Sequence, residues 1–317
     1  MQQVLFFDFD LYLPVEKRWG PIFDKYEKNI PTICAELNKI LEQFGVGTTI
    51  LKPLYNITPE SNIMFYDEIR YIAKRTNMDP FHILLMQLIY ETSSACTAAV
   101  LNIGGKEIFI RTMDWPMPFL KDITIGLNII KRGKHIAKVT TWLGYIGFLT
   151  ATNIENDYTI AINYRRTAEI SIGTLIKNLY RTVSQKWPVG YLIRYVIENN
   201  FDYDTSKDML IRFQLISPCY MTLYRKNGSN IITRDCDSAS VRNCELIQTN
   251  CDWNKTEPNI LWSLERVSAI KEVQKRIDDG EITGAKEAIK EVLKFPVMNE
   301  ETIYVHIQYD GKNKTLV

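Results

Sequence analysis

The side chain with the clearest chemical potential is Cys96, which follows Ser93, Ser94 and Ala95 at the point where a helical pattern changes to a strand pattern. Cleavage of the Ala95–Cys96 bond would make Cys96 an N-terminal residue. Its new α-amine, with a pKa of about 8, could then take the thiol proton. Because the thiolate is the attacking species, one residue would supply both the nucleophile and its base.

Two charged residues, Arg111 and Asp114, follow on the next expected strand. Gly104-Gly105 predicts a two-residue hairpin turn that pairs positions whose numbers sum to about 209, so residue 113 should lie opposite Cys96. A cation at Arg111 would then favour the thiolate, and Asp114 could hold an α-ammonium group by a charge-assisted hydrogen bond. The alternative is a buried, unreactive cysteine, which is the more common outcome for such spacing alone.

The elements that would position these residues change in type along the chain. Apolar spacing between Pro14 and Phe44 predicts amphipathic helix with a break near Pro31, after a short strand at 3–10. Two more helices are expected within 59–92, one starting near Thr58-Pro59-Glu60 and one at Asp79-Pro80, an N-cap followed by an N1 proline. The front section is therefore predicted to be mainly helical.

From Cys96 onwards, blocks of hairpins alternate with helices. This order predicts an α+β protein in which packed antiparallel sheets are covered by helices, and it argues against a doubly wound parallel sheet. Strands are expected at 97–102, 107–113, 123–130, 135–142, 145–152, 158–163, 218–225, 229–234, 244–249 and 302–309, and helices at 171–183, 188–199, 205–212, 260–278 and 284–293.

Composition limits the partners. The 38 basic and 37 acidic residues nearly cancel, so no nucleic-acid partner is expected. The longest apolar run, 81–90, is too short to span a membrane. The N-terminus lacks the features of a signal peptide because Asp8 and Asp10 interrupt its apolar run, which predicts a cytoplasmic protein if the chain is complete. The six cysteines form no C-x-x-C, and no metal site is expected.

Cys96-Thr97 followed by Arg111-x-x-Asp114 resembles the signature of the acid ceramidase and N-acylethanolamine-hydrolysing acid amidase family. That family belongs to the choloylglycine hydrolase group of N-terminal nucleophile hydrolases. The resemblance continues in order along nearly the whole chain, at 8–14 with Lys17-Arg18-Trp19, and at 90–93, 144–147, 233–235, 248–253, 266–269, 295–299 and 302–304.

The resemblance implies a self-cleaving precursor with the four-layer αββα fold. Cleavage between Ala95 and Cys96 would leave a helical small subunit, 1–95, and a catalytic large subunit, 96–317, which stay associated. The family pattern places catalysis on Cys96, Arg111, Asp114, Asn250 as oxyanion donor and Arg266 as support. It implies neither a metal nor an organic cofactor. It further implies a lipid amide substrate, contact with a membrane surface and a lysosomal location.

The activity implied is hydrolysis of the amide bond of an N-acylated lipid to a free fatty acid and an amine. N-Acylethanolamine is the expected substrate, because the segments 90–93, 114–116 and 187–194 are more similar to that branch of the family. Hydrolysis of ceramide is the alternative.

The chain departs from the family pattern at Asn163-Tyr164-Arg165, where Tyr164 stands in place of a glutamate. A phenol can donate to an oxyanion but cannot act as a carboxylate. We therefore expect Asn163 and Tyr164 to contact the substrate or the oxyanion. Trp115 and Trp142 are candidates for the lining of an apolar acyl channel, although plain core packing is the commoner role of such residues.

Two other interpretations stay open from the sequence. Without the glutamate, the chain could be an inactive, uncleaved relative that binds a lipid or a partner, for which a helix at 81–92 offers an apolar face. An apolar strand ending in Asp8-x-Asp10 also resembles the first motif of haloacid dehalogenase-type phosphatases. The usual Gly-Thr and the alternating strand–helix pattern of those enzymes are missing.

Overall fold

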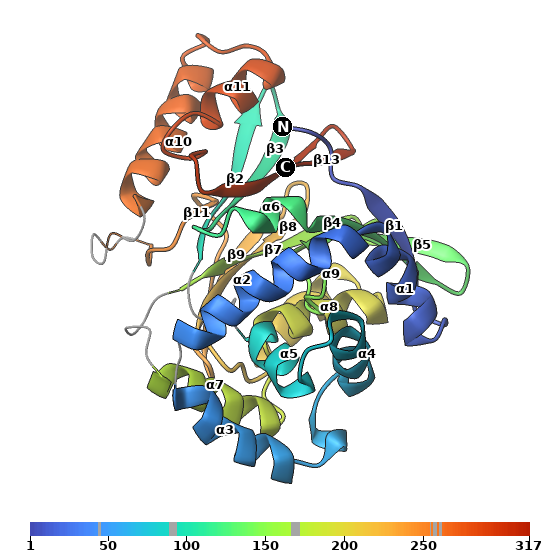
Figure 1. Cartoon of the computed structure of the whole chain (residues 1–317). Helices are drawn as coiled ribbons and strands as arrows, with labels where there is room; N and C mark the ends of the chain where they lie inside the picture. Colours follow the sequence, from blue (N-terminus) through green and yellow to red (C-terminus); the bar gives the residue numbers. More distant parts are fainter. Residues whose placement is uncertain (44–45, 89–93, 166–171, 254, 256–258, 260–261) are drawn as a thin grey trace.

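Two β-sheets and a set of helices make up the computed structural model, which describes residues 1–43, 46–88, 94–165, 172–253, 255, 259 and 262–317 (Figure 1). The smaller sheet has five strands in the order β11-β2-β3-β12-β13. They are β2 (Ala95–Ile103), β3 (Lys106–Asp114), β11 (Ile247–Gln248), β12 (Thr302–Tyr309) and β13 (Lys312–Leu316).

The larger sheet has eight strands in the order β1-β4-β5-β6-β7-β8-β9-β10, and within it only β1 and β4 pair in parallel. The strands are β1 (Phe6–Asp10), β4 (Thr124–Lys131), β5 (Lys134–Trp142), β6 (Thr150–Asn153), β7 (Tyr158–Tyr164), β8 (Cys219–Tyr224), β9 (Asn230–Arg234) and β10 (Ala239–Arg242).

The helices divide between the two outer faces (Figure 1). α10 (Ser263–Asp278) and α11 (Ala285–Val292) cover the five-stranded sheet. The remaining helices, apart from the short α6 near β12, lie on the side of the eight-stranded sheet. They are α1 (Val15–Lys25), α2 (Ile30–Gln43), α3 (Val46–Ile57), α4 (Tyr66–Thr76), α5 (Pro80–Gln87), α7 (Ile172–Val183), α8 (Val189–Asn199) and α9 (Tyr203–Arg212), and the excepted α6 is Phe119–Asp122.

Successive side chains of a strand point to opposite faces of its sheet. Each sheet can therefore pack against helices on one face and against the other sheet on the opposite face. On β2, Ala99 packs with Ile270 of α10, whereas the neighbouring Ala98 faces the other sheet. There the rings of Phe109 and Tyr224 stack with centroids 5.0 Å apart. The predicted four-layer αββα arrangement is confirmed.

The hairpin of β2 and β3 has the predicted register. Gly104 and Gly105 have φ values of 56° and 75°, the left-handed region that a two-residue primed turn requires and that glycine adopts without steric cost. Cys96 consequently pairs with Met113. The predicted start of α5 is also confirmed, since the Asp79 side chain accepts from the amide of Phe81 at 2.9 Å.

Some predicted boundaries were wrong. Thr58-Pro59-Glu60 leads into a 3₁₀ turn at Glu60–Asn62, and α4 begins only at Tyr66. The strand expected at 145–152 begins at Thr150, because residues before it form a turn closed by a Tyr145 N to Trp142 O hydrogen bond. α3, β10 and β13 were not predicted. α3 contains Pro53, and β10 and β13 are short, with mostly polar or exposed side chains.

The section before Cys96 pairs and packs with the rest of the fold through several of its described residues. β1 adds a strand to the eight-stranded sheet beside β4. The amide of Gln2 donates to Val317 O at 2.8 Å, so the two ends of the chain lie together (Figure 1). Among the described residues, no helix is long and apolar enough to cross a membrane.

Candidate functional site

Cys96 is the second residue of β2 and is fully buried in the layer between the two sheets. Its Sγ lies 3.4 Å from Nη2 of Arg111 and 3.3 Å from Sδ of Met113. Arg111, Met113 and Cys96 face the same layer because Cys96 pairs with Met113 and Arg111 is two residues away on β3. The structure thus brings the predicted cation to the predicted nucleophile.

Arg111 is held by the elements around it. Its Nη2 donates to Ile162 O of β7 at 3.1 Å, across the gap between the sheets. Its guanidinium lies over the ring of Tyr304 on β12, 4.6 Å from the centroid. A guanidinium fixed beside a sulfur in a buried layer stabilises the negative charge of a thiolate.

Asn250, just after β11, has its side-chain amide fully used. Its Oδ1 accepts from the amide nitrogen of Cys96 and from Nη2 of Arg266, both at 2.9 Å. Its Nδ2 donates to Tyr164 O at 2.8 Å and to Ser94 O at 3.2 Å. An asparagine side chain offers two donors and one oxygen with two lone pairs, so these partners fix which way the amide points.

Arg266 on α10 contacts both the start of β2 and the side chain of Asn250. Its Nη1 donates to Cys96 O at 2.7 Å and to Thr97 Oγ1 at 3.0 Å, and its Nη2 donates to Ser263 Oγ at 3.1 Å. Asp114 Oδ2 lies 3.8 Å from Nη1 of Arg266. Burial lowers the pKa of this guanidinium, and Asp114 opposes that effect.

Asp114 lies on the face of β3 that points towards α10, opposite to the face of Arg111 and Met113. It accepts from Thr302 Oγ1 at 2.6 Å and from Thr112 Oγ1 at 3.3 Å. Burial raises the pKa of Asp114 to about 6, although Thr302, Arg266 and Arg111 act in the opposite direction. Asp114 therefore reaches the Cys96 backbone through Arg266, and a direct contact with a new α-amine stays a prediction.

Tyr164, which stands at the family's glutamate position, and the preceding Asn163 are both buried at the end of β7. Tyr164 contributes its backbone oxygen to Asn250. Asn163 donates through Nδ2 to Gln248 O at 2.9 Å and to Thr249 O at 3.3 Å, which ties β7 to the segment carrying Asn250. Contacts of the Asn163 and Tyr164 side chains with a substrate remain predictions.

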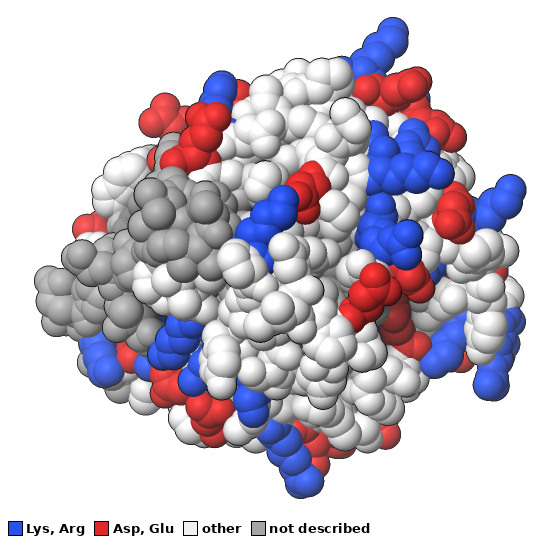
Figure 2. All heavy atoms as spheres, turned by 60° about the horizontal axis from the view of Figure 1, so that its bottom comes forward, with Lys and Arg blue, Asp and Glu red and all other residues white. Residues whose placement is uncertain are grey.

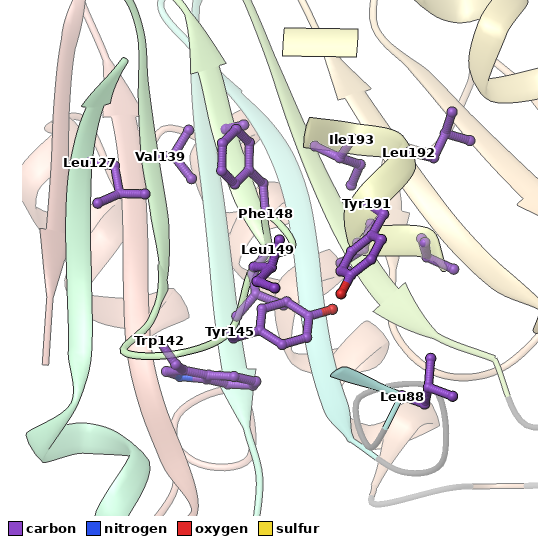
Figure 3. Packing of buried hydrophobic residues seen from close by; sticks show 14 of the residues in the cluster. Leu88, Leu127, Val139, Trp142, Tyr145, Phe148, Leu149, Tyr191, Leu192 and Ile193 are labelled. Atoms are coloured by element: carbon purple, nitrogen blue, oxygen red, sulfur yellow. The ribbon is translucent and has the colours of Figure 1, made fainter. Parts of the chain in front are cut away.

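Trp115 and Trp142 lie together, with ring centroids 5.6 Å apart. Both line a narrow apolar cavity, and Trp115 directly follows the last residue of β3. Figure 3 shows Trp142 beside Tyr145, another lining residue. Helices of the 1–95 section supply much of the wall, including Phe23, Ile33, Leu37, Ile72 and Met86.

Sequence reasoning missed several residues of this site. Met113 contacts the thiol and Tyr304 contacts its cation. The hairpin register predicted that residue 113 lies opposite Cys96 but assigned it no role in the site, and no local pattern indicated Tyr304. Arg165 and Asp252 form an ion pair beside Asn250, and nothing in their spacing indicates it. Residues 90–93, which the resemblance includes, and residues 171 and 260–261, with which two of the predicted helices begin, lie outside the described residues. Within the described residues, no cluster of three metal-ligating side chains occurs.

Comparison with known proteins identifies relatives of this chain. No model of a known protein family matches the chain. An uncharacterized protein, R632, of Acanthamoeba polyphaga mimivirus is 43% identical over 317 residues, covering 98% of both chains. The N-acylethanolamine-hydrolyzing acid amidase of Caenorhabditis elegans is 25% identical over 330 residues, covering 96% of this chain and 89% of the relative. Acid ceramidase of Bos taurus is 23% identical over 253 residues, covering 73% and 64%.

A solved structure agrees with these relatives. The Caenorhabditis elegans N-acylethanolamine-hydrolyzing acid amidase ortholog superimposes with a TM-score of 0.57 and 25% identity, covering 68% of this chain and 94% of that one. The chain belongs to the acid ceramidase and N-acylethanolamine-hydrolysing acid amidase family. As a member of this family it is an amide-bond hydrolase with the N-terminal nucleophile fold, and autocatalytic cleavage of a precursor is typical of the family.

Family membership excludes the phosphatase interpretation of Asp8 and Asp10. The structure gives the physical reason: β1 is an edge strand of a mainly antiparallel sheet, and Asp8 is exposed. The first motif of those phosphatases requires a strand within an alternating strand–helix fold.

Proposed function

We propose that this chain hydrolyses the amide bond of N-acylethanolamines after releasing Cys96 as the N-terminal residue of a large subunit, 96–317. Hydrolysis of an amide in an N-acylated lipid is the general activity that the relatives support. The observation that carries the proposal is the position of Cys96, whose Sγ is 3.4 Å from Arg111 and whose amide nitrogen is 2.9 Å from Asn250.

Self-cleavage begins with attack of Cys96 Sγ on the carbonyl carbon of Ala95. The C–N bond between Ala95 and Cys96 then breaks, the amide nitrogen gains a proton, and a thioester joins Ala95 to Sγ. Water hydrolyses this thioester, which leaves a carboxylate on Ala95 and a free α-amine on Cys96. Asn250 already holds the nitrogen that becomes this amine.

Turnover of a substrate uses the same atoms. The α-amine takes the Sγ proton, and Sγ attacks the acyl carbon of the lipid amide. The amine half of the substrate leaves with a proton, and water releases the fatty acid from the thioester. The Nδ2 hydrogen of Asn250 that now binds Ser94 O becomes available for the oxyanion once the end of the small subunit moves away.

The apolar cavity supplies a place for the acyl chain. It is lined almost entirely by apolar side chains from both sections of the chain, and Trp115, one of them, follows the end of β3, the strand that carries Arg111. An extended hydrocarbon gains free energy by leaving water for such a surface. Tyr164, whose phenol is a donor, would face the oxyanion or the leaving group in place of the family's glutamate.

The two subunits would remain one folded unit after cleavage. Glu68 of the small subunit is buried and accepts from Arg194 of the large subunit at 2.6 and 2.7 Å. The small subunit also contributes Arg18, 2.9 Å from Glu68, and Trp19, whose Nε1 donates to Glu68 at 2.7 Å. These contacts act together with the pairing of β1 and β4.

A membrane surface is the proposed source of the substrate. α3 and α7 contact each other on the underside of the molecule, and exposed apolar side chains there include Ile57, Ile176 and Tyr180. Figure 2 shows this side with a broad uncharged area between charged groups. Such a face suits contact with lipid rather than with nucleic acid.

A panel of amides tests the proposal. Fatty acylethanolamides, ceramides and bile-salt conjugates would be assayed at acidic and neutral pH, with Cys96→Ala as the control. We expect turnover of acylethanolamides to exceed that of ceramides and to disappear in Cys96→Ala. Faster turnover of ceramide would move the chain to the other branch, and equal turnover by Cys96→Ala would overturn the nucleophile assignment.

A further inference from the structure

The end of β7 and the segment after β11 are joined residue by residue beside the nucleophile. Asn163 donates to the backbone oxygens of Gln248 and Thr249, and Tyr164 O accepts from Asn250. Further along the two segments, Arg165, the residue after Tyr164, forms an ion pair with Asp252, two residues after Asn250. β7 belongs to the eight-stranded sheet and β11 to the five-stranded sheet, so these contacts close the sandwich at the end where Cys96 lies.

The Arg165–Asp252 pair has a geometry that fixes orientation. Nε of Arg165 lies 2.7 Å from Oδ1 of Asp252, and Nη2 lies 3.0 Å from Oδ2, so the pair is bidentate. Tyr220 OH donates to the same Oδ1 at 2.8 Å. The two charged side chains are only 13% and 21% exposed.

Other charged groups keep the pair ionised. Arg165 also contacts Asp235 at 2.7 Å, and Lys255 contacts Asp252 at 2.8 Å. The hydrogen bonds from Arg165, and then from Lys255 and Tyr220, hold the pKa of Asp252 far below its usual range, against the effect of burial. The carboxylate therefore stays charged well into acid.

We propose that Arg165 and Asp252 are positioning residues that set the side chain of Asn250 relative to Cys96. Asp252 follows Asn250 by two residues, and Arg165 directly follows Tyr164, whose oxygen receives one Asn250 hydrogen. The ion pair thus fixes both backbone positions that determine where the amide points. The inference rests on the proposed function, in which Asn250 serves the oxyanion.

The effect on kcat distinguishes a positioning role of the ion pair from a purely structural one. Because the pair is bidentate and largely buried, its loss also lowers the free energy of unfolding, and the urea midpoint measures this part of the effect. An oxyanion donor, by contrast, acts only when it lies within hydrogen-bond reach of the developing charge, and small displacements reduce the rate strongly. Loss of the pair should therefore lower the kcat of the fully folded variant, with little change in KM, by more than its loss of stability accounts for.

The test compares Asp252→Asn and Arg165→Met, alone and together, with Arg165→Lys as the conservative variant. Lys255→Met is the matched control, because it removes another cation from Asp252 and leaves Arg165 in place. For each protein, kcat and KM on a fatty acylethanolamide, the rate of self-cleavage and the urea midpoint would be measured.

We expect kcat to fall about tenfold to a hundredfold in either single variant, with KM within about twofold of wild type. The double variant should be no slower than the slower single variant, and Arg165→Lys should recover part of the rate. Asp252→Asn is nearly isosteric, so it supplies the measurement if Arg165→Met does not fold.

Unchanged kcat in Asp252→Asn, or an equal loss in Lys255→Met, would overturn the positioning role. Cys96→Ala separates this failure from that of the proposed function. If Cys96→Ala is inactive while the ion-pair variants keep the wild-type kcat, only the positioning inference fails. If Cys96→Ala retains turnover, the proposed function itself fails.

Discussion

The amide nitrogen of Cys96 donates to Oδ1 of Asn250 at 2.9 Å, although 154 residues separate the two in sequence. Through this bond Asn250, the candidate donor to the oxyanion, contacts the nitrogen that self-cleavage would convert into an amine. Because Arg266 donates to the same oxygen, the orientation of the Asn250 amide is determined before any cleavage occurs.

Replacing Asn250 by aspartate tests the donor role. The variant keeps the oxygen that faces Cys96 but turns the Nδ2 donor into an acceptor facing Tyr164 O and Ser94 O. We expect both self-cleavage and kcat to fall by about a hundredfold or more, as on removal of an oxyanion donor. Fragment formation and steady-state kinetics measure the two rates. Asn102→Asp, at an exposed strand position, is the control, and a wild-type cleavage rate in Asn250→Asp would contradict the role.

Asp114 predicts a specific dependence of stability on pH. Burial raises the pKa of Asp114 to about 6 from a model-compound value of 3.8, so the folded protein binds this proton more tightly than the unfolded chain. The corresponding stability is present below pH 3.8 and is lost as the pH rises to 6. The shift corresponds to roughly 3 kcal/mol.

Asp114→Asn should remove this loss. Urea unfolding between pH 4 and 7 would show wild type losing stability relative to Asp114→Asn as the pH rises, with a constant difference above pH 6. The exposed Asp208→Asn is the control. Parallel pH profiles for wild type and Asp114→Asn would show that the carboxyl titrates normally.

The buried Glu68 should hold the cleaved halves together. Burial alone would raise the pKa of Glu68, but Arg194 and Arg18 lower it overall, so the cluster stays ionised in acid. Breaking such a buried pair costs about 3–5 kcal/mol. In the cleaved protein, Glu68→Gln should separate the two fragments at lower urea concentration, as measured by size-exclusion chromatography.

Glu198→Gln is the matched control for Glu68→Gln. Glu198 also pairs with Arg194, at 2.6 Å, but both residues lie in 96–317 and Glu198 is more exposed. We expect its fragments to separate close to the wild-type urea concentration. Equal behaviour of the two variants would contradict the link across the cleavage point.

We expect the Trp142 side chain to limit the length of acyl chain that the cavity accepts. Trp142→Ala enlarges the cavity beside Trp115, so kcat/KM for long acyl chains should rise relative to short ones. The same change removes buried surface and should cost about 3–5 kcal/mol in stability. A series of acylethanolamides of increasing length measures the profile, with the exposed Trp253→Ala as control. An unchanged profile would place the acyl chain elsewhere.

Local patterns in the sequence were sufficient for the hairpin that carries the site. Gly104-Gly105 determines the turn, and the turn determines that Met113 faces Cys96. The family resemblance indicated Asn250 and Arg266, which no local pattern could bring to Cys96. Packing of α10 and the segment after β11 against β2 does so in the structure.

Tertiary contacts explain what the sequence did not show. The Arg165–Asp252 and Glu68–Arg194 pairs join residues 87 and 126 positions apart, and charged residues at such separations are usually solvated surface. α3 was missed because Pro53 and polar neighbours weaken its local pattern. The register implied that Asp114 points to the face opposite Met113, but it could not indicate the partner Arg266 on that face.

Intact-mass spectrometry of the purified protein, before and after incubation at acidic pH, tests the central assignment most directly. For wild type, we expect two chains, 1–95 and 96–317, with Cys96 as the first residue of the second. Cys96→Ala should remain a single chain. A wild-type protein that stays intact yet hydrolyses acylethanolamides, or a Cys96→Ala protein cut at the same bond, would show that Cys96 is not a self-released N-terminal nucleophile.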